Sequence, residues 1–270
     1  MAYALVTGAA KGIGKGIATE LARRNYNLLL ADIDETGLAA SALEITTRHH
    51  VIVHTLPLDL TQSDAGKQLI DWTANWHDKL TVVVNNAGYG LNGAFEQLEL
   101  EDQLNIIDLN IKAQVSLSHL YIPVLRKHVQ GYLLNVASTT AYQSVPYLTI
   151  YAASKAFVLS FTRGLRFELR NSTVSVSCLI PGSTDTNFVE RANMSEATKK
   201  TAERFNMSPE AVGIIAVNGL FKRKAEIIPG INNKLHAFFP KFFPKLFVEK
   251  IAAGIYGPKE EAIQPVKSLA

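Results

Sequence analysis

The chain has 270 residues but only one cysteine, and its histidines are not spaced like metal ligands. Cys178 lies inside an apolar run, where a thiol usually behaves as a small buried hydrophobic side chain, and a single cysteine excludes an internal disulfide. The seven histidines form neither an H-x-x-x-H motif nor a paired Cys/His pattern. We therefore predict no metal site.

The sequence also has little net charge, no evident linker and no leader segment. A formal charge of +3 is too small and too dispersed to indicate nucleic-acid binding. No linker rich in Pro, Gly or Ser divides the chain, and 47% of its residues are hydrophobic, so we expect a single domain over 1–270. No charged and then apolar leader follows Met1, which predicts a cytoplasmic protein.

Apolar runs alternate with amphipathic segments along the chain. Such alternation predicts an α/β fold with a doubly wound, mostly parallel sheet. Strands are expected at 4–7, 27–31, 51–56, 80–84, 132–136 and 174–180, and helices near 12–24, 35–48, 61–77, 101–128 and 150–170.

A glycine-rich turn follows the first expected strand. Gly8, Lys11, Gly12, Ile13 and Gly14 lie in it, between Thr7 and an amphipathic helix. Backbone N–H groups and the positive end of the helix dipole would converge there, and glycines leave room for a pyrophosphate. The spacing therefore predicts a dinucleotide site.

The second expected strand ends at Asp32, where a carboxylate would bind the adenosine ribose hydroxyls. A carboxylate there repels a 2′-phosphate, which favours NAD. Asp34 is a weaker candidate for the same role. Lys11 could instead attract such a phosphate, so NADP stays an alternative.

A phenol and an ammonium stand four residues apart in Tyr151-Ala152-Ala153-Ser154-Lys155. On a helix they share a face, and an adjacent ammonium would lower the pKa of the phenol from about 10. Tyr151 could then exchange a proton with a substrate oxygen near neutral pH. Ser138, at the carboxyl end of the fifth expected strand, could hold that oxygen.

Together these motifs closely resemble the short-chain dehydrogenase/reductase family over about 4–230. The resemblance implies a Rossmann-type oxidoreductase with the catalytic tetrad Asn110, Ser138, Tyr151 and Lys155. It also implies cofactor contacts from Asp59, Asn86, Ala87, Gly88, Tyr151, Lys155, Pro181, Gly182, Thr184 and Thr186. Asn110 would hold a water beside Lys155. The alternative is a non-catalytic dinucleotide sensor, but sensors usually lose the tetrad, and all four positions are filled here.

In the family the stretch after Pro181-Gly182 forms a lid, here 185–207. The apolar residues Phe188, Val189 and Met194 on that stretch indicate a hydrophobic alcohol or ketone, 3-oxoacyl or steroid-like, as the small-molecule substrate. The rest of the pocket would be lined by Tyr89, Leu91, Tyr142, Gln143 and Tyr147.

The C-terminal extension, near 231–270, contains five phenylalanines and three basic residues within 236–247. This segment could contact a membrane surface, or pack against the substrate cleft or another subunit. The helices expected at 102–128 and 151–170 carry more apolar residues than one buried face needs, including Ile111, Val115, Tyr121 and Phe157. Family members pair these helices in a four-helix bundle, so we expect a homodimer or a homotetramer.

Overall fold

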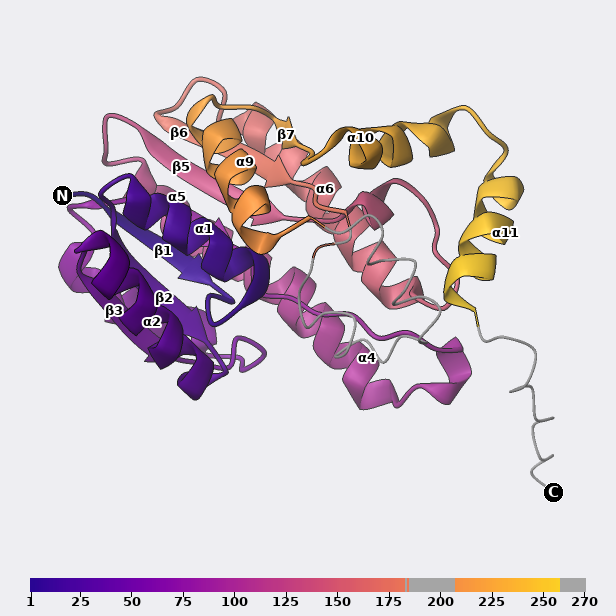
Figure 1. Ribbon diagram of the computed structural model, residues 1–270, viewed down its shortest axis with the longest axis horizontal. Helices are drawn as coiled ribbons and strands as arrows, with labels where there is room; N and C mark the ends of the chain where they lie inside the picture. The colour runs from indigo at the N-terminus through magenta and orange to yellow at the C-terminus, as the bar shows by residue number, and fades with distance from the viewer. Residues whose placement is uncertain (183, 185–206, 258–270) are drawn as a thin grey trace.

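The computed structural model describes residues 1–182, 184 and 207–257. Seven strands form one sheet in the order β3-β2-β1-β4-β5-β6-β7, and every neighbouring pair is parallel. The expected doubly wound α/β fold is therefore confirmed. Helices flank the sheet (Figure 1).

Six of the seven strands match the predicted apolar runs. They are β1 (Tyr3–Thr7), β2 (Asn27–Asp32), β3 (Val53–Pro57), β4 (Leu80–Asn85), β5 (Gly131–Val136) and β6 (Val174–Leu179). The seventh, β7 (Glu226–Ile227), pairs with β6 through two residues and is too short to give a sequence pattern.

Successive residues of the strands enter two separate cores, one on each face of the sheet. Ala4 and Val6 of β1 pack in one core, whereas Tyr3 and Leu5 pack in the other. The first core also contains residues of α1 (Gly12–Arg23), α2 (Glu35–His49) and α9 (Pro209–Phe221). The second contains residues of α3 (Ala65–Trp72) and α5 (Gln114–Leu125) and the end of α6 (Thr149–Glu168). Burial on both faces explains why the strands are apolar throughout.

The helix expected at 101–128 is not continuous, which corrects the prediction. It consists of α4 (Leu100–Ile107), a π-helical turn (Asp108–Ala113) and α5. A π turn adds one residue to the helical repeat and rotates the following side chains, and no periodicity in the sequence announces it. The prediction at 61–77 was also too long, because α3 ends at Trp72 and a short 3-10 turn follows at Ala74–Trp76.

Beyond β7 the chain forms two helices that leave the sheet. They are α10 (Ile231–Phe238) and α11 (Lys245–Tyr256), with a 3-10 turn at Phe239–Lys241 between them. Figure 1 shows α10 and α11 in orange and yellow, on the side of the molecule opposite β2 and β3. Ala252 of α11 packs with Val145, Leu148 and Ala152, so this helix covers the start of α6.

Helices α1 and α9 approach each other through two glycines. A Cβ at Gly213 would lie 2.3 Å from the carbonyl oxygen of Gly16, and one at Gly16 would lie 2.2 Å from that of Pro209. Both obstacles are backbone atoms, so they cannot rotate away. This contact fixes α9 against the helix that follows the glycine-rich turn.

We predict that Gly213→Ala lowers the free energy of unfolding by about 2 kcal/mol or more, because the added methyl overlaps a backbone carbonyl. Gly254→Ala is the matched control, since a Cβ at this glycine of α11 meets nothing within 4 Å. The control should change stability by no more than about 1 kcal/mol, and in the stabilising direction. Urea unfolding of both variants at one protein concentration measures the difference, and equal stabilities would contradict the proposed close contact.

Candidate active site

The glycine-rich turn leaves the carboxyl end of β1 in a conformation that needs glycine. Gly8 and Gly12 have φ angles of 66° and 58°, where side chains with a Cβ are strained. A Cβ at Gly14 would lie 2.0 Å from the carbonyl oxygen of Gly8, so this third glycine allows the turn to close. Gly14 does not line the cavity described below; its role in this structure is packing.

Asn86 joins the turn to the end of β4. Its side-chain amide donates to the carbonyl oxygens of Thr7 at 2.9 Å and Gly8 at 3.0 Å. In return, the Thr7 hydroxyl accepts from the backbone N–H groups of Asn86 and Ala87 at 3.1 and 3.2 Å. These bonds connect two strand ends that are far apart in the sequence and support the central sheet.

Asp32 ends β2 beside the turn. Its carboxylate accepts from the backbone N–H of Ala10 at 2.9 Å and from that of Asp34 at 3.0 Å. Asp34 has a different role, because its carboxylate caps α2 through Gly37 and lies 3.6 Å from the Lys11 ammonium. Asp32 and Lys11 line the cavity, so both groups that bear on the choice between NAD and NADP are in place.

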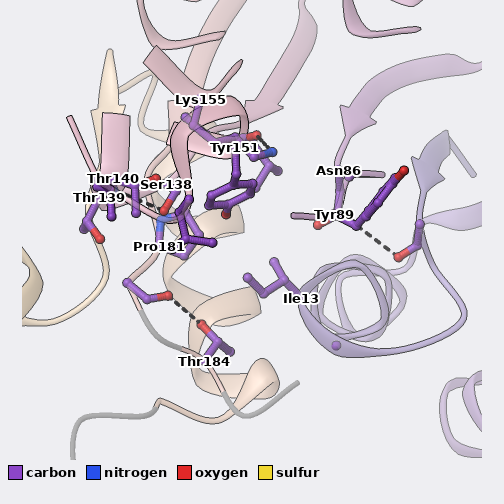
Figure 2. Close-up of a pocket in the computed structure, with 18 of the residues that line it drawn as sticks. Ile13, Asn86, Tyr89, Ser138, Thr139, Thr140, Tyr151, Lys155, Pro181 and Thr184 are labelled. Atoms are coloured by element: carbon purple, nitrogen blue, oxygen red, sulfur yellow. Dashed lines mark hydrogen bonds between the residues drawn. The ribbon is translucent and has the colours of Figure 1, made fainter. Parts of the chain in front are cut away.

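A cavity of about 880 Å³ lies along the carboxyl edge of the sheet. The turn contributes Gly8, Lys11, Gly12 and Ile13, and the next strand ends contribute Asp32, Asp59 and Asn86 to Tyr89. The remaining predicted cofactor residues of the described chain, Pro181, Gly182 and Thr184, also line it. Figure 2 shows Tyr151, Ser138 and Pro181 on one side of this space and Asn86 and Tyr89 on the other. Thr186 lies outside the described residues.

Ser138 and Tyr151 meet in the cavity wall. Ser138 precedes the 3-10 turn Thr139–Tyr142, and its hydroxyl accepts from the Thr140 backbone N–H at 3.2 Å. Ser138 lowers the pKa of the Tyr151 phenol, as a neighbouring hydroxyl does. Figure 2 shows the two side chains on the same side of the cavity.

Asn110 and Lys155 both lie next to Gly88. A Cβ at Gly88 would come within 2.8 Å of Asn110 Oδ1 and 3.1 Å of Lys155 Nζ. Lys155 Nζ donates to the Val136 carbonyl at 3.1 Å and lies 5.7 Å from the centre of the Tyr151 ring. The structure thus brings the four residues of the predicted tetrad together.

Asn110 lies in the π turn, and hydrogen bonds fix its side chain there. The residue is fully buried, and its amide donates to the Tyr89 carbonyl at 2.9 Å and to Ser154 Oγ at 3.0 Å, while its Oδ1 accepts from the Tyr89 N–H at 3.1 Å. Every polar atom of the amide has a partner. Asn110 therefore fixes the backbone of Tyr89 beside the cavity.

Burial shifts the pKa values of both ionisable tetrad residues. Desolvation raises the pKa of Tyr151 to about 12, the hydrogen bond from Ser138 opposes the shift, and nearby Tyr256 adds to it. Desolvation also lowers the pKa of Lys155 to about 8. In this structure the pKa of Tyr151 is therefore raised, whereas the sequence predicted a lowered value, because loss of solvation disfavours the phenolate.

The predicted substrate residues divide into two groups. Tyr89 and Gln143 line the cavity, although the Tyr89 hydroxyl also donates to the Asp102 carbonyl at 3.1 Å. Tyr147 and Tyr142 do not line it: the Tyr147 carbonyl accepts from Gly93 and Asn92, and the Tyr142 hydroxyl donates to Glu226 at 2.7 Å. Phe188 and the predicted lid lie outside the described residues, except for Met207.

Sequence reasoning missed most of the apolar wall of the cavity. Residues of α10 and α11 line it, among them Leu235, Val248, Ile251, Ile255 and Tyr256. Of the Phe-rich segment, His236 and Phe239 face the cavity, which agrees with one of the two interpretations of that segment. The sequence signal for this wall was the apolar character of 246–256. That pattern is the same as in any amphipathic surface helix, so it did not identify a cavity wall.

The described residues contain no group of three or more His, Cys, Asp or Glu side chains that could hold a metal ion. Cys178 is a free thiol buried in β6.

Comparison with known proteins places these motifs in one family. The model of the short chain dehydrogenase family matches residues 2–197. An uncharacterized oxidoreductase of Staphylococcus saprophyticus is 33% identical over 183 residues, which cover 68% of this chain and 78% of that protein.

Two solved structures show the same architecture. A short-chain dehydrogenase from Sphingobium yanoikuyae in complex with NADPH has a TM-score of 0.78 at 25% identity, covering 98% of this chain and 99% of the other. A short-chain dehydrogenase/reductase from Burkholderia phymatum in complex with NAD also has a TM-score of 0.78, at 21% identity, covering 90% and 96%.

The depressed pKa of Lys155 predicts a measurable cost in stability. Below about pH 8 the folded protein buries an ammonium, whereas above the unfolded value, 10.5, the group is neutral in both states. Lys155→Met should therefore be more stable than the wild type at pH 7, by about 1–3 kcal/mol. Because wild-type stability rises relative to the variant between about pH 8 and 10.5, this gap should shrink over that range. Urea unfolding at a series of pH values measures it, and a gap independent of pH would contradict the cause.

Proposed function

The chain belongs to the short-chain dehydrogenase family, and we propose from this that it transfers a hydride between a nicotinamide dinucleotide and a hydrophobic alcohol or ketone. The observation that carries the proposal is that Ser138, Tyr151 and Lys155 line a cavity that also contains the glycine-rich turn and Asp32. One cavity thus joins a dinucleotide cradle to a proton-transfer group.

Each end of the cavity suits one part of the reaction. The backbone of Gly12 and Ile13 at the start of α1 would hold the pyrophosphate, and Asp32 and Asp59 would hold the adenosine. When bound, the nicotinamide would supply or accept the hydride. The residues present at this end fit such a cofactor, because Gly8, Gly12 and the Asp32 carboxylate line the cavity beside the start of α1.

Ser138 and Tyr151 would handle the substrate oxygen. A pKa of about 12 keeps the Tyr151 hydroxyl protonated at neutral pH, so it can donate a proton to the oxygen of a carbonyl that accepts a hydride. Ser138 would orient the same oxygen. The Lys155 ammonium would stabilise negative charge that develops on the phenol during transfer.

The apolar wall supports a hydrophobic substrate. Val145 and Leu148 approach the tetrad from one side and Val248, Ile251 and Ile255 from α11. Few polar groups interrupt this wall, so a bulky alcohol or ketone of the 3-oxoacyl or steroid-like class fits it better than a sugar.

The proposed activity can be tested with Tyr151→Phe, which removes the proton-donating oxygen but keeps the ring. Turnover should fall by about 10²-fold or more, since general acid catalysis contributes at least that much. Nicotinamide absorbance measures turnover on a substrate found by screening apolar ketones and alcohols. Cofactor affinity, from reduced-cofactor fluorescence, should stay within about threefold, because the ring remains in place. A variant that keeps half of the wild-type kcat would refute the role of Tyr151 and favour a non-catalytic dinucleotide-binding module.

We further propose that NAD is preferred, because the Asp32 carboxylate lies where a 2′-phosphate would be repelled. Lys11 is the opposing feature, but its ammonium is already 3.6 Å from Asp34. Asp32→Ala should narrow or invert the preference by removing the repulsion. Fluorescence titration with both reduced cofactors measures this, and tighter binding of NADPH by the unmutated protein would contradict the assignment.

The outer face of α6 supports a homodimer, or a tetramer built from it. Phe157 is 41% exposed, its ring stacks on Phe161 at 5.9 Å, and a Cβ at Gly164 would meet nothing within 4 Å. On α5, Val115 is exposed as well. Tyr121, however, is fully buried against Leu69 and Thr73, so it belongs to the core rather than to the expected surplus.

Phe157→Arg should therefore shift the protein toward monomer, because an isologous contact would place two such charges together. Light scattering over a dilution series measures the mass. A wild-type monomer at micromolar concentration would contradict the proposed dimer.

A further inference from the structure

Exposed apolar side chains gather on α10, α11 and the turn between them. Of the 22 large hydrophobic side chains that are exposed in the described chain, ten lie within 231–255. Phe242 is 78% exposed and Leu246 is 65% exposed. We call these ten residues the apolar patch; they are Ile231, Leu235, Phe238, Phe239, Phe242, Phe243, Leu246, Phe247, Ile251 and Ile255. Scattered apolar residues are normal on a surface, but a cluster of this size indicates a binding face.

The aromatic part of the patch is ordered by its own contacts. The rings of Phe239 and Phe243 stack at 4.2 Å, and those of Phe243 and Phe247 lie 5.8 Å apart. Pro240 and Pro244 interrupt the helix between these rings, because proline cannot continue it, and the chain bends there. The rings thus form a row along the bend rather than separate points.

Basic residues accompany the patch. The segment 231–257 contains four lysines and one glutamate. Lys234, Lys245 and Lys250 are exposed on α10 and α11, the helices that flank the aromatic rings, whereas Glu249 is half-buried. Aromatic rings together with lysines are the composition of surfaces that lie in the interface of an anionic membrane.

The patch is continuous with the mouth of the cavity. Leu235, Phe239, Ile251 and Ile255 are exposed and also line the cavity. A surface that covered the patch would therefore lie against the opening through which an apolar molecule could pass. None of the described helices combines the length and apolar character that a bilayer crossing requires.

We propose that the apolar patch docks this protein onto an anionic lipid surface. A second copy of the chain is the less suitable occupant, because an isologous contact through the patch would bring the lysines of both copies together with little acidic charge to offset them. A lipid surface offers both an apolar layer for the rings and anionic headgroups for the lysines. Docking itself does not depend on the proposed enzymatic activity.

Sedimentation with phosphatidylcholine vesicles that contain phosphatidylglycerol tests the proposal, without cofactor or substrate. The wild type should bind these vesicles more tightly than pure phosphatidylcholine vesicles, and added salt should weaken the binding, because screening reduces the lysine contribution. Phe242→Ser combined with Leu246→Ser should lower the partition coefficient by at least about tenfold, since two apolar anchors are lost. Neither residue lines the cavity.

The matched control combines Leu43→Ser with Phe167→Ser, which are 70% and 67% exposed but lie on α2 and α6. The control should bind vesicles like the wild type. Replacing Lys245 and Lys250 by glutamine should weaken binding to the anionic vesicles alone, by about fivefold for each lysine.

Three results would overturn the proposal. The first is equal binding to both kinds of vesicle, the second is binding that the patch variant retains, and the third is no binding at all. If light scattering also showed that the patch variant alone loses dimer mass, the patch would be a contact between copies of the chain.

Discussion

The site depends on the hydrogen bonds that the Asn86 amide donates to the carbonyls of Thr7 and Gly8. They connect the ends of β1 and β4, which are neighbours in the sheet, although Thr7 and Gly8 lie 79 and 78 residues before Asn86 in the sequence. The amide thereby holds the glycine-rich turn against the residues that follow β4. The turn and these residues then line one binding space side by side.

The wall that contains the proposed tetrad includes features that lower stability. Burial of Lys155 lowers its pKa to about 8, so the fold accepts an ammonium in poorly solvated surroundings. Asn110 lies in a π-helical turn, whose geometry departs from that of a regular helix. Its amide donates a hydrogen bond to the Tyr89 carbonyl in the same wall. Strained or poorly solvated groups persist where surrounding contacts determine them, and they are common at functional sites.

The sequence predicted the strands and the cavity residues at their carboxyl ends, because both follow from local signals. Runs such as Leu28 to Leu30 are apolar on both faces, and glycines mark the turn. It could not predict the π turn at 108–113, which changes the helical repeat without changing composition. The sequence predicted a lowered pKa for Tyr151, whereas burial and the nearby Tyr256, which only the fold brings about, raise it.

The family model covers one part of the cavity lining and leaves out another. The model ends at residue 197, after the turn, the tetrad and every strand except β7. Helices α10 and α11 lie beyond it and contribute much of the apolar wall. The proton transfer proposed for Tyr151 would therefore depend on the part of the chain that the family model describes, whereas the shape available to a substrate would depend largely on the two C-terminal helices. Tyr256 of α11 also raises the pKa of Tyr151. A substitution in the apolar wall would therefore also change the pKa of Tyr151.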